Sequence, residues 1–172
     1  MDAQLAALIR DIPDFPAPGI LFRDITTLLK EGEPFKACID LLADQLKSLG
    51  ATKVVGIESR GFIFAAPIAY VLGVGFVPVR KLGKLPAETI TAEYDLEYGS
   101  NTVEMHSDAI ELGERVIIVD DLLATGGTTR ATIELVEQLG GRIVALAFLV
   151  ELTDLGARES LERYNIVTAI RF

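Results

Sequence analysis

Apolar strand-like segments alternate with helical segments along most of the chain, and this alternation is the strongest constraint on its fold. Strands that alternate with helices form a parallel sheet through right-handed crossovers. The expected strands are almost continuously apolar, which is typical of a sheet covered on both faces. The sequence therefore predicts an α/β fold with a mostly parallel central sheet flanked by helices. We expect strands at residues 53–57, 76–79, 115–119, 143–150 and 166–170, and helices at 34–49, 61–72 and 128–139.

The segments outside this alternation are polar or rich in proline. Residues 2–10 have the spacing of a short amphipathic helix, and residues 11–19, with three prolines, are expected to be extended or turning. Residues 81–101 are expected to form a long loop with one short strand at its end. With 172 residues and no internal repeat or linker, the chain fits a single domain over residues 1–172.

Composition narrows the class of protein. A net charge of -9 argues against nucleic acid or an anionic membrane surface as the main partner. The apolar runs are too short to span a membrane, and the first ten residues do not resemble a signal peptide. The single cysteine, Cys38, excludes an internal disulfide, and its helical apolar context indicates a buried residue. We therefore expect a cytoplasmic protein without a membrane or nucleic-acid partner.

The most informative segment follows the expected strand at residues 115–119. An acidic pair, Asp120 and Asp121, precedes a loop with two glycines and several threonines, which we call the phosphate loop (residues 124–128). Glycines allow close backbone approach, and the N–H groups at the start of the following helix favour an anion. Carboxylates repel phosphate but accept hydrogen bonds from sugar hydroxyls. The combination predicts a ribose 5-phosphate site, and it lacks the lysine of a Walker A loop.

Basic residues gather at the ends of two other strands in an otherwise acidic chain. Arg60 begins the helix at 61–72, Arg80 and Lys81 end the next strand, and Lys84 lies in the following loop. A local excess of positive charge at strand ends suggests an anionic ligand such as diphosphate. The polar segment after Lys84 has the length of a lid, which would exclude water and could carry an acid that relays a proton.

Five segments, in this order, resemble type I phosphoribosyltransferases, and most closely the adenine-specific members. They are FPAPGILFRDIT at residues 15–26, ESRGF at 58–62, RKLGKLP at 80–86, EYDLEYG at 93–99 and VDDLLATGGT at 119–128. The resemblance implies the fold of that family, with an N-terminal hood that binds the base (residues 1–33) and a flexible lid loop (residues 81–101). It also implies a homodimer.

The resemblance further implies a purine salvage reaction in which adenine and 5-phosphoribosyl 1-diphosphate give AMP and diphosphate. Mg2+ would be required, held mainly by substrate and water rather than by protein ligands. Glu97, Arg60 and Lys84 would be catalytic, and Tyr94 and Tyr98 would help close the lid. The ribose 5-phosphate would contact Asp120, Asp121, Ala124, Thr125, Gly126, Gly127 and Thr128. Diphosphate would contact Ser59, Arg60, Arg80, Lys81 and Lys84, and adenine would contact Phe22, Arg23 and Leu123.

Two residues stand apart from these assignments. Ala65 occupies a position where the family pattern suggests glycine, which we expect to alter helix packing rather than chemistry. His106 is expected to orient the strand after the lid or to touch a partner subunit rather than to act as a base.

Three alternatives stay open on the sequence alone. The chain could act on another purine base, such as hypoxanthine or xanthine. It could be a regulator that keeps the sugar-phosphate pocket as a sensor, although it lacks a basic helix that would bind nucleic acid. It could also be a nucleotide-binding structural module, which the acids and tyrosines of the lid argue against.

Overall fold

The computed structural model describes residues 2–95 and 100–172, and a sheet of seven strands forms its centre. The strand order is β5-β6-β4-β3-β7-β8-β9. The five strands from β4 to β9 run parallel to their neighbours, whereas β6 is antiparallel to β4 and β5 is antiparallel to β6. The bounds are β3 Lys53–Ile57, β4 Gly75–Lys81, β5 Thr89–Asp95, β6 Ser100–His106, β7 Arg115–Leu123, β8 Arg142–Glu151 and β9 Ile166–Arg171. The predicted mostly parallel α/β sheet is confirmed.

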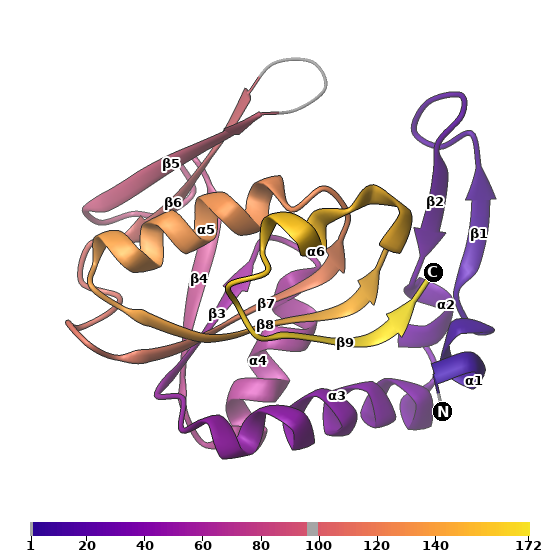
Figure 1. The fold of residues 1–172 in the computed structure, drawn as a ribbon, viewed down its shortest axis with the longest axis horizontal. Coiled ribbons are helices and arrows are strands. Elements are labelled where there is room, and N and C mark those ends of the chain that lie inside the picture. The colour runs from indigo at the N-terminus through magenta and orange to yellow at the C-terminus, as the bar shows by residue number, and fades with distance from the viewer. Residues whose placement is uncertain (1, 96–99) are drawn as a thin grey trace.

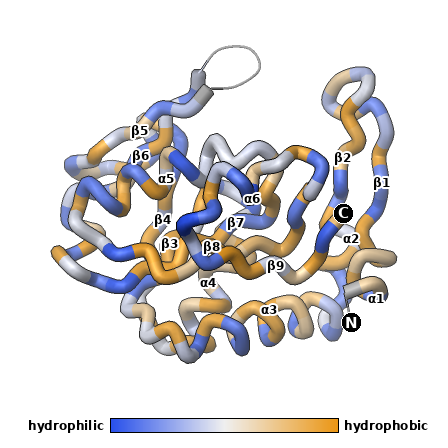
Figure 2. The backbone as a smooth tube through the Cα atoms, viewed as in Figure 1, coloured by the Kyte–Doolittle hydropathy of each residue, from blue (hydrophilic) through white to orange (hydrophobic). Residues whose placement is uncertain are grey.

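Helices cover both faces of this sheet (Figure 1). On one face lie α3 (Gly32–Leu46), which a 3-10 turn at Lys47–Leu49 extends, and α4 (Gly61–Leu72). On the other face lie α5 (Gly127–Gln138) and the short α6 (Ala157–Ser160), which follows a 3-10 turn at Thr153–Leu155. Alternate residues of the strands feed the two cores, so that Ile117 packs toward α3 and α4 while Ile118 packs toward α5. Figure 2 shows the apolar colouring concentrated along the sheet and the helix faces that meet it.

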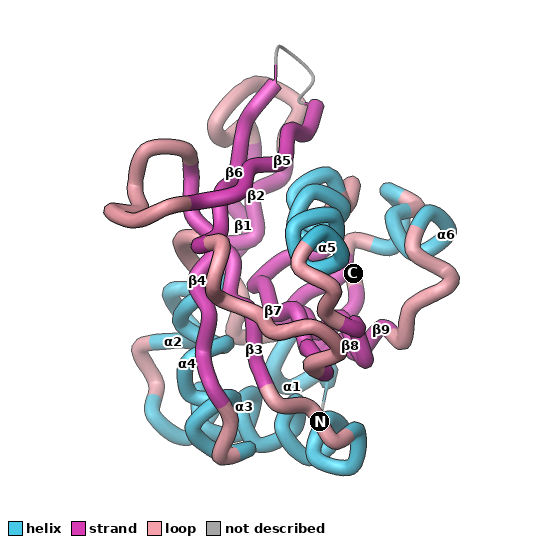
Figure 3. Tube along the Cα trace, turned by 90° about the vertical axis from the view of Figure 1, so that its left-hand side faces the viewer, coloured by secondary structure: helices cyan, strands magenta, loops and turns pink. Residues whose placement is uncertain are grey.

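The N-terminal segment forms a separate small unit. Helix α1 (Asp2–Ala6) is followed by β1 (Arg10–Pro13) and β2 (Leu21–Asp24), which pair with each other in an antiparallel two-stranded sheet. Helix α2 (Thr26–Leu29) then leads into α3. The prediction of one helix over residues 2–10 was too long, because β1 begins at Arg10 and uses the extended backbone that proline favours. Figure 1 shows the small hairpin on the side of the sheet where the chain ends, and Figure 3 shows α5 and α6 on one side of the strands and α3 and α4 on the other.

The prediction of a long loop at residues 81–101 was wrong for residues 89–95, whereas residues 82–88 are loop as expected. Residues Thr89–Asp95 and Ser100–His106 form the antiparallel strands β5 and β6 at one edge of the sheet. Their inward residues, among them Ala92, Val103 and Met105, are buried against the core. Their outward residues are polar, and this gives the segment the composition of a loop although its alternation is that of an edge hairpin.

The sequence did not predict β2, α2 or α6, and the other differences are shifts of element ends. Strand β7 runs to Leu123, so the acidic pair lies within the paired part of the strand rather than after it. Asp120 is opposite Phe148 of β8. Helix α5 begins at Gly127, one residue earlier than expected. None of the described helices is both long and apolar enough to cross a membrane.

Close contact between α4 and β3 accounts for Ala65. Its side chain is fully buried, and a Cβ placed on Gly56 of β3 would lie 2.7 Å from the Ala65 Cβ. The methyl group of Ala65 therefore occupies the space that Gly56 leaves. This agrees with the expectation that the departure from the family pattern concerns helix packing.

Candidate active site

The phosphate loop connects the end of β7 to the start of α5. Its Gly126 adopts a left-handed conformation (φ 78°, ψ 9°), whereas Gly127 begins the right-handed helix. Such a change of handedness turns successive N–H groups toward one centre, which creates an anion-binding concavity. The first helical hydrogen bond runs from the Arg130 N–H to the Gly126 carbonyl (2.9 Å). The preceding N–H groups have no partner within the helix and are available to an anion.

A small cavity of about 110 Å³ lies inside this loop. The structure brings together six of the seven residues predicted to contact ribose 5-phosphate, and it adds Tyr94 from β5. The lining residues are Tyr94, Asp120, Leu122, Ala124, Thr125, Gly126, Gly127, Thr128 and Thr129. Asp121, the seventh predicted residue, lies next to this set and is buried.

The acidic pair is held in an environment that disfavours two charges. Burial, and then the charge of Asp121, raise the pKa of Asp120 well above its ordinary range. Burial also raises the pKa of Asp121, although Arg60 opposes this shift. The Asp121 N–H donates a hydrogen bond to Asp120 Oδ1 (2.9 Å). A carboxylate whose pKa is raised holds a proton more tightly, and when it is ionised it is also a strong acceptor of hydrogen bonds from the hydroxyl groups of a bound sugar.

Arg60 links the acidic pair to the start of α4. Its Nε lies 2.8 Å from Asp121 Oδ2. The approach of the two elements depends on Gly61, because a Cβ there would lie 2.7 Å from Asp120 Oδ1 and 3.1 Å from the Val119 carbonyl oxygen. The glycine of the ESRGF segment therefore allows the predicted diphosphate-binding arginine to meet the predicted sugar-binding carboxylates.

A second arginine is anchored by an acid that the sequence analysis did not assign to the site. Arg80 donates to both carboxylate oxygens of Glu58 (3.2 Å each) and to the Lys84 carbonyl (3.1 Å). Glu58 also accepts from the Lys81 N–H (3.0 Å). Burial opposes ionisation of Glu58, but hydrogen bonds from Arg80 and Lys81 lower its pKa overall. Glu58 thus fixes the backbone that carries the predicted diphosphate contacts, while Ser59 beside it is exposed.

Glu104 is a further acid that the sequence analysis missed. It is 3 % exposed on β6, and it accepts hydrogen bonds from the N–H groups of Lys84 (2.7 Å) and Leu85 (2.8 Å). Burial opposes its ionisation, yet these backbone donors lower the pKa of Glu104 overall. The turn that presents the exposed Lys84 side chain is therefore fixed by a buried carboxylate. Glu104 fixes backbone groups that lie 20 and 19 residues earlier in the chain, and a sequence pattern does not show so distant a contact.

The hood brings aromatic and basic residues toward the same edge. Phe22 meets Phe15 edge to face, with ring centres 5.1 Å apart, and the Arg60 guanidinium lies 5.3 Å from the Phe22 ring centre. Arg23 pairs with Asp11 across the hood, and its guanidinium lies 4.0 Å from the ring centre of Phe172. The sequence analysis did not foresee a role for Phe172.

One predicted residue, Leu123, does not line the cavity, and two others lie outside the described residues. Leu123 is 1 % exposed and packs in the core on the α5 side, and the neighbouring Leu122 lines the cavity instead. Glu97 and Tyr98 lie outside the described residues. His106 ends β6, and its Nε2 is buried without a hydrogen-bond partner within the described ranges.

Comparison with known proteins agrees with this geometry. The model of the phosphoribosyl transferase domain matches residues 24–170. The adenine phosphoribosyltransferase of Carboxydothermus hydrogenoformans is 55% identical over 168 residues, covering 98% of this chain and 99% of the relative. The chain belongs to the adenine phosphoribosyltransferase family.

Two structures of family members superpose over nearly the whole chain. The crystal structure of the enzyme from Thermoanaerobacter pseudethanolicus has a TM-score of 0.97 and 52% identity, and it covers 100% of both chains. That of the Saccharomyces cerevisiae enzyme, complexed with an imino-altritol bisphosphate and adenine, has a TM-score of 0.93 and 41% identity, with 98% and 97% of the chains covered. The type I phosphoribosyltransferase fold expected from the sequence is confirmed.

Proposed function

We propose that this chain converts adenine and 5-phosphoribosyl 1-diphosphate to AMP and diphosphate in purine salvage. The observation that carries the proposal is the placement of an anion-binding loop directly beside an acidic pair, of which Asp120 lines the cavity and Asp121 is buried. This arrangement suits a sugar phosphate. Similarity to adenine phosphoribosyltransferases over the whole chain supports adenine as the base, and the yeast family member was crystallised with adenine.

The 5-phosphate is proposed to bind the N–H groups at the start of α5, with hydroxyl donors from Thr125 and Thr128. The helix dipole and the left-handed Gly126 favour an anion at this point. The ribose hydroxyls then face Asp120 and Asp121, which accept their hydrogen bonds. Because phosphate and hydroxyls are recognised by different groups, the sugar is held in one orientation with C1 toward Arg60.

Departure of diphosphate leaves positive character at C1 of the ribose. We propose that Arg60, Lys84 and the Arg80–Lys81 pair bind the leaving diphosphate, with Ser59 beside them. Asp121 and Glu58 orient Arg60 and Arg80 through the contacts described above. Both arginines are therefore set in place before substrate arrives, which reduces the ordering that catalysis requires.

Mg2+ is proposed as the cofactor. The described residues contain no cluster of three or more histidine, cysteine or acidic side chains. Asp121 already pairs with Arg60, so the residues present fit a Mg2+ held mainly by substrate oxygens and water. When bound, Mg2+ would neutralise charge on the leaving diphosphate.

The base is proposed to bind between the hood and the sugar. Phe22 offers an aromatic face, and Arg23 offers backbone groups to the edge of the ring. Glu97 is proposed to take the proton from adenine N7 or N9, which makes N9 nucleophilic. Tyr94, which lines the phosphate cavity, and Tyr98 would help the lid exclude water from the reacting sugar.

A homodimer and a cytoplasmic location stay predictions. Large apolar side chains are exposed on α4 and on the adjoining β4, namely Ile63, Tyr70, Val71 and Phe76. An exposed apolar surface of this kind is typical of a subunit interface. Light scattering coupled to gel filtration would measure the mass, and a mass of one chain at all concentrations would contradict the dimer.

The deciding experiment measures nucleotide formation with adenine, hypoxanthine, guanine and xanthine, each with and without Mg2+. We expect AMP formation with adenine at a kcat/KM at least about 100-fold above the other bases, since buried hydrogen bonds discriminate strongly. A preference for another base would overturn the adenine assignment. Binding of 5-phosphoribosyl 1-diphosphate without turnover of any base would favour the sensor.

A further inference from the structure

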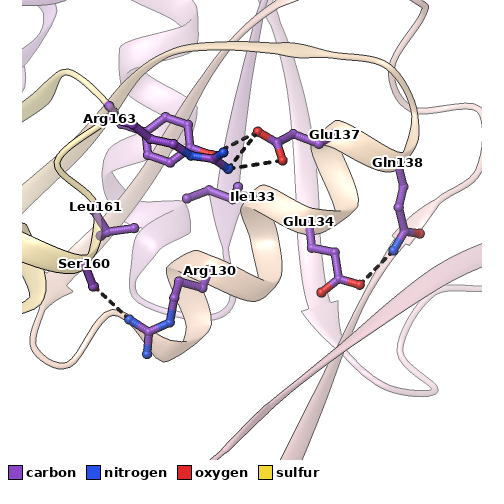
Figure 4. Close-up of a pocket in the computed structure, with 9 residues that line it drawn as sticks. Arg130, Ile133, Glu134, Glu137, Gln138, Ser160, Leu161 and Arg163 are labelled. Carbon is purple, nitrogen blue, oxygen red and sulfur yellow. Dashed lines mark hydrogen bonds and ion pairs between the residues drawn. The ribbon is translucent and has the colours of Figure 1, made fainter.

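A groove of about 570 Å³ lies beside α5, and Figure 4 shows the residues that line it. It is bounded by α5 and by the segment from α6 to β9, and none of the residues assigned to substrates above lines it. Arg130 stands at the end of the groove nearest the phosphate loop. Its side chain reaches across the gap between α5 and α6.

Arg130 Nη1 makes two hydrogen bonds that connect these elements. It donates to the Thr125 carbonyl (3.0 Å) and to Ser160 Oγ (3.0 Å). Ser160 uses its own hydrogen to donate to the Ala157 carbonyl (2.8 Å), so its oxygen is left to accept from the arginine. The phosphate loop is thereby tied to α6 through one guanidinium group.

Helix α6 is a firm support for this tie. Arg158 forms a two-pronged pair with Glu151, with distances of 2.8 Å and 2.6 Å, and Glu151 is 3 % exposed at the end of β8. Ala157 is also buried against the core. A Cβ on Gly126 would lie 3.5 Å from the Ala157 Cβ and 3.2 Å from Arg130 Nη1, so α6 and Arg130 both pack directly behind the loop.

The contact with Thr125 fixes the direction of a whole peptide group. The peptide between Thr125 and Gly126 is trans, since the cis bonds of the chain lie elsewhere. In a trans peptide the C=O and the following N–H point in opposite directions. When Arg130 holds the Thr125 carbonyl outward, the Gly126 N–H is directed away from Arg130, into the loop. The guanidinium charge of Arg130, placed against the Thr125 carbonyl, also polarises the peptide group. This makes the Gly126 N–H a stronger hydrogen-bond donor.

We propose that Arg130 is a positioning residue for the 5-phosphate. It lies outside the cavity, is anchored by Ser160, and orients the Thr125–Gly126 peptide so that the Gly126 N–H points toward the phosphate. The inference rests on the proposed binding of the 5-phosphate at this loop. It predicts a selective effect, because the base and the diphosphate are bound by other elements.

The test compares Arg130→Met with Arg130→Lys, and uses Arg163→Met as the matched control. Arg163 lines the same groove but pairs with Glu137 rather than with the loop. Arg130→Met should raise KM for 5-phosphoribosyl 1-diphosphate and the Kd of ribose 5-phosphate by about 5–20-fold, which is less than the loss of a direct charge-assisted hydrogen bond to the phosphate would cause, because Arg130 only orients one donor. KM for adenine and the Kd of diphosphate should stay within about twofold of wild type.

Arg130→Lys should recover part of the affinity for ribose 5-phosphate, and Arg163→Met should leave it unchanged. Ser160→Ala, which keeps the Thr125 contact and removes the second anchor, should give a smaller rise and provides a milder variant if Arg130→Met fails to fold. Equal effects of Arg130→Met and Arg163→Met, or of Arg130→Met on all ligands, would overturn the inference.

Thr128→Val separates this inference from the proposed function on which it rests. If Thr128→Val weakens ribose 5-phosphate binding and Arg130→Met does not, the role of Arg130 is wrong and the phosphate placement stands. If neither variant weakens it, the phosphate is bound elsewhere, and both proposals fail.

Discussion

The guanidinium carbon of Arg23 lies 4.0 Å from the centre of the Phe172 ring, which ties the hood to the end of the last strand of the central sheet. Phe172 is itself fixed, because its N–H donates to the Glu151 carbonyl and its carbonyl accepts from the Thr153 N–H, each at 2.9 Å. The hood, which is proposed to bind the base, is therefore held against the sheet by a residue far from it in sequence.

Phe172→Ala should raise KM for adenine about 2–5-fold, the effect of losing a cation–π contact of about 0.5–1 kcal/mol. KM for 5-phosphoribosyl 1-diphosphate should not change, because the phosphate loop is untouched. Phe172→Tyr keeps the ring face and should behave like wild type in the same steady-state assay. A similar rise in both KM values would contradict a contact specific to the hood.

Asp120→Asn should stabilise the protein and impair it. Burial, and then the charge of Asp121, raise the pKa of Asp120, so its ionised form at neutral pH costs folding free energy. We expect a Tm about 2–4 °C higher at pH 7.5, the shift produced by about 1 kcal/mol in a chain of this length. We also expect kcat/KM for 5-phosphoribosyl 1-diphosphate to fall at least about tenfold as a charged acceptor is lost.

The Tm difference between Asp120→Asn and wild type should depend on pH, because it arises from ionisation of Asp120. A carboxyl with a raised pKa destabilises the folded chain increasingly as pH rises above its unfolded value near 3.8. The Tm advantage of Asp120→Asn should therefore shrink as pH falls toward 4, where wild-type Asp120 is protonated. A constant advantage from pH 4 to pH 8, measured by scanning calorimetry, would show that ionisation is not the cause.

Asp24→Asn should destabilise the protein, with the opposite pH dependence. Hydrogen bonds from Thr26, and then from Arg10, lower the pKa of Asp24 to about 2. Asp24 accepts from the Thr26 N–H (2.9 Å), its hydroxyl (2.7 Å) and Arg10 Nε (3.1 Å). Loss of the charged acceptor should cost about 1–2 kcal/mol of unfolding free energy at pH 7.

This contribution of Asp24 is present above its unfolded pKa of 3.8 and is lost as pH falls through about 2. The difference in urea midpoint between wild type and Asp24→Asn should hence be constant from pH 7 to pH 5 and narrow below pH 4. Asp44→Asn removes an exposed carboxylate that pairs with Lys47, and it should change the midpoint little. An equal loss in both variants would refute the special role of Asp24.

Glu97→Gln should lower kcat more than it changes KM for either substrate. If Glu97 takes the proton from adenine, kcat should fall about 100-fold or more, the usual range for a general base. Glu93, an exposed acid on β5, offers a matched control, and Glu93→Gln should keep kcat within about twofold. Unchanged kinetics of Glu97→Gln in a single-turnover assay would rule out the proton relay.

The sequence predicted the central part of the fold well because that part is buried. Residues 116–119 of β7 are fully buried on both faces, so their apolar run is unambiguous. The phosphate loop was also predictable, because a left-handed residue before a helix is usually glycine, and the loop around Gly126 is rich in glycine and threonine. Both features depend on residues that are close together in the chain, so they can be recognised from the sequence alone.

The edges of the molecule were harder to predict. The β5–β6 hairpin hides its alternation among polar outward residues, and β1 ends at Pro13, which argues against a strand in most contexts. The sequence analysis also missed residues that hold other site residues or their backbone in place without lining the cavity. Glu58, Glu104 and Phe172 act on groups distant in sequence, so their partners become visible only when the chain is folded.

The hood has its own two-stranded sheet, and its strands share no pairing with the seven-stranded sheet that carries the phosphate loop. A substitution in β1 or β2 can therefore change the surface that is proposed to meet the base without shifting the register of any strand of the seven-stranded sheet. Directed evolution of base preference should begin in this hairpin. Variants found there should inherit an intact sugar-phosphate site, so that altered selectivity and retained turnover are compatible in one molecule.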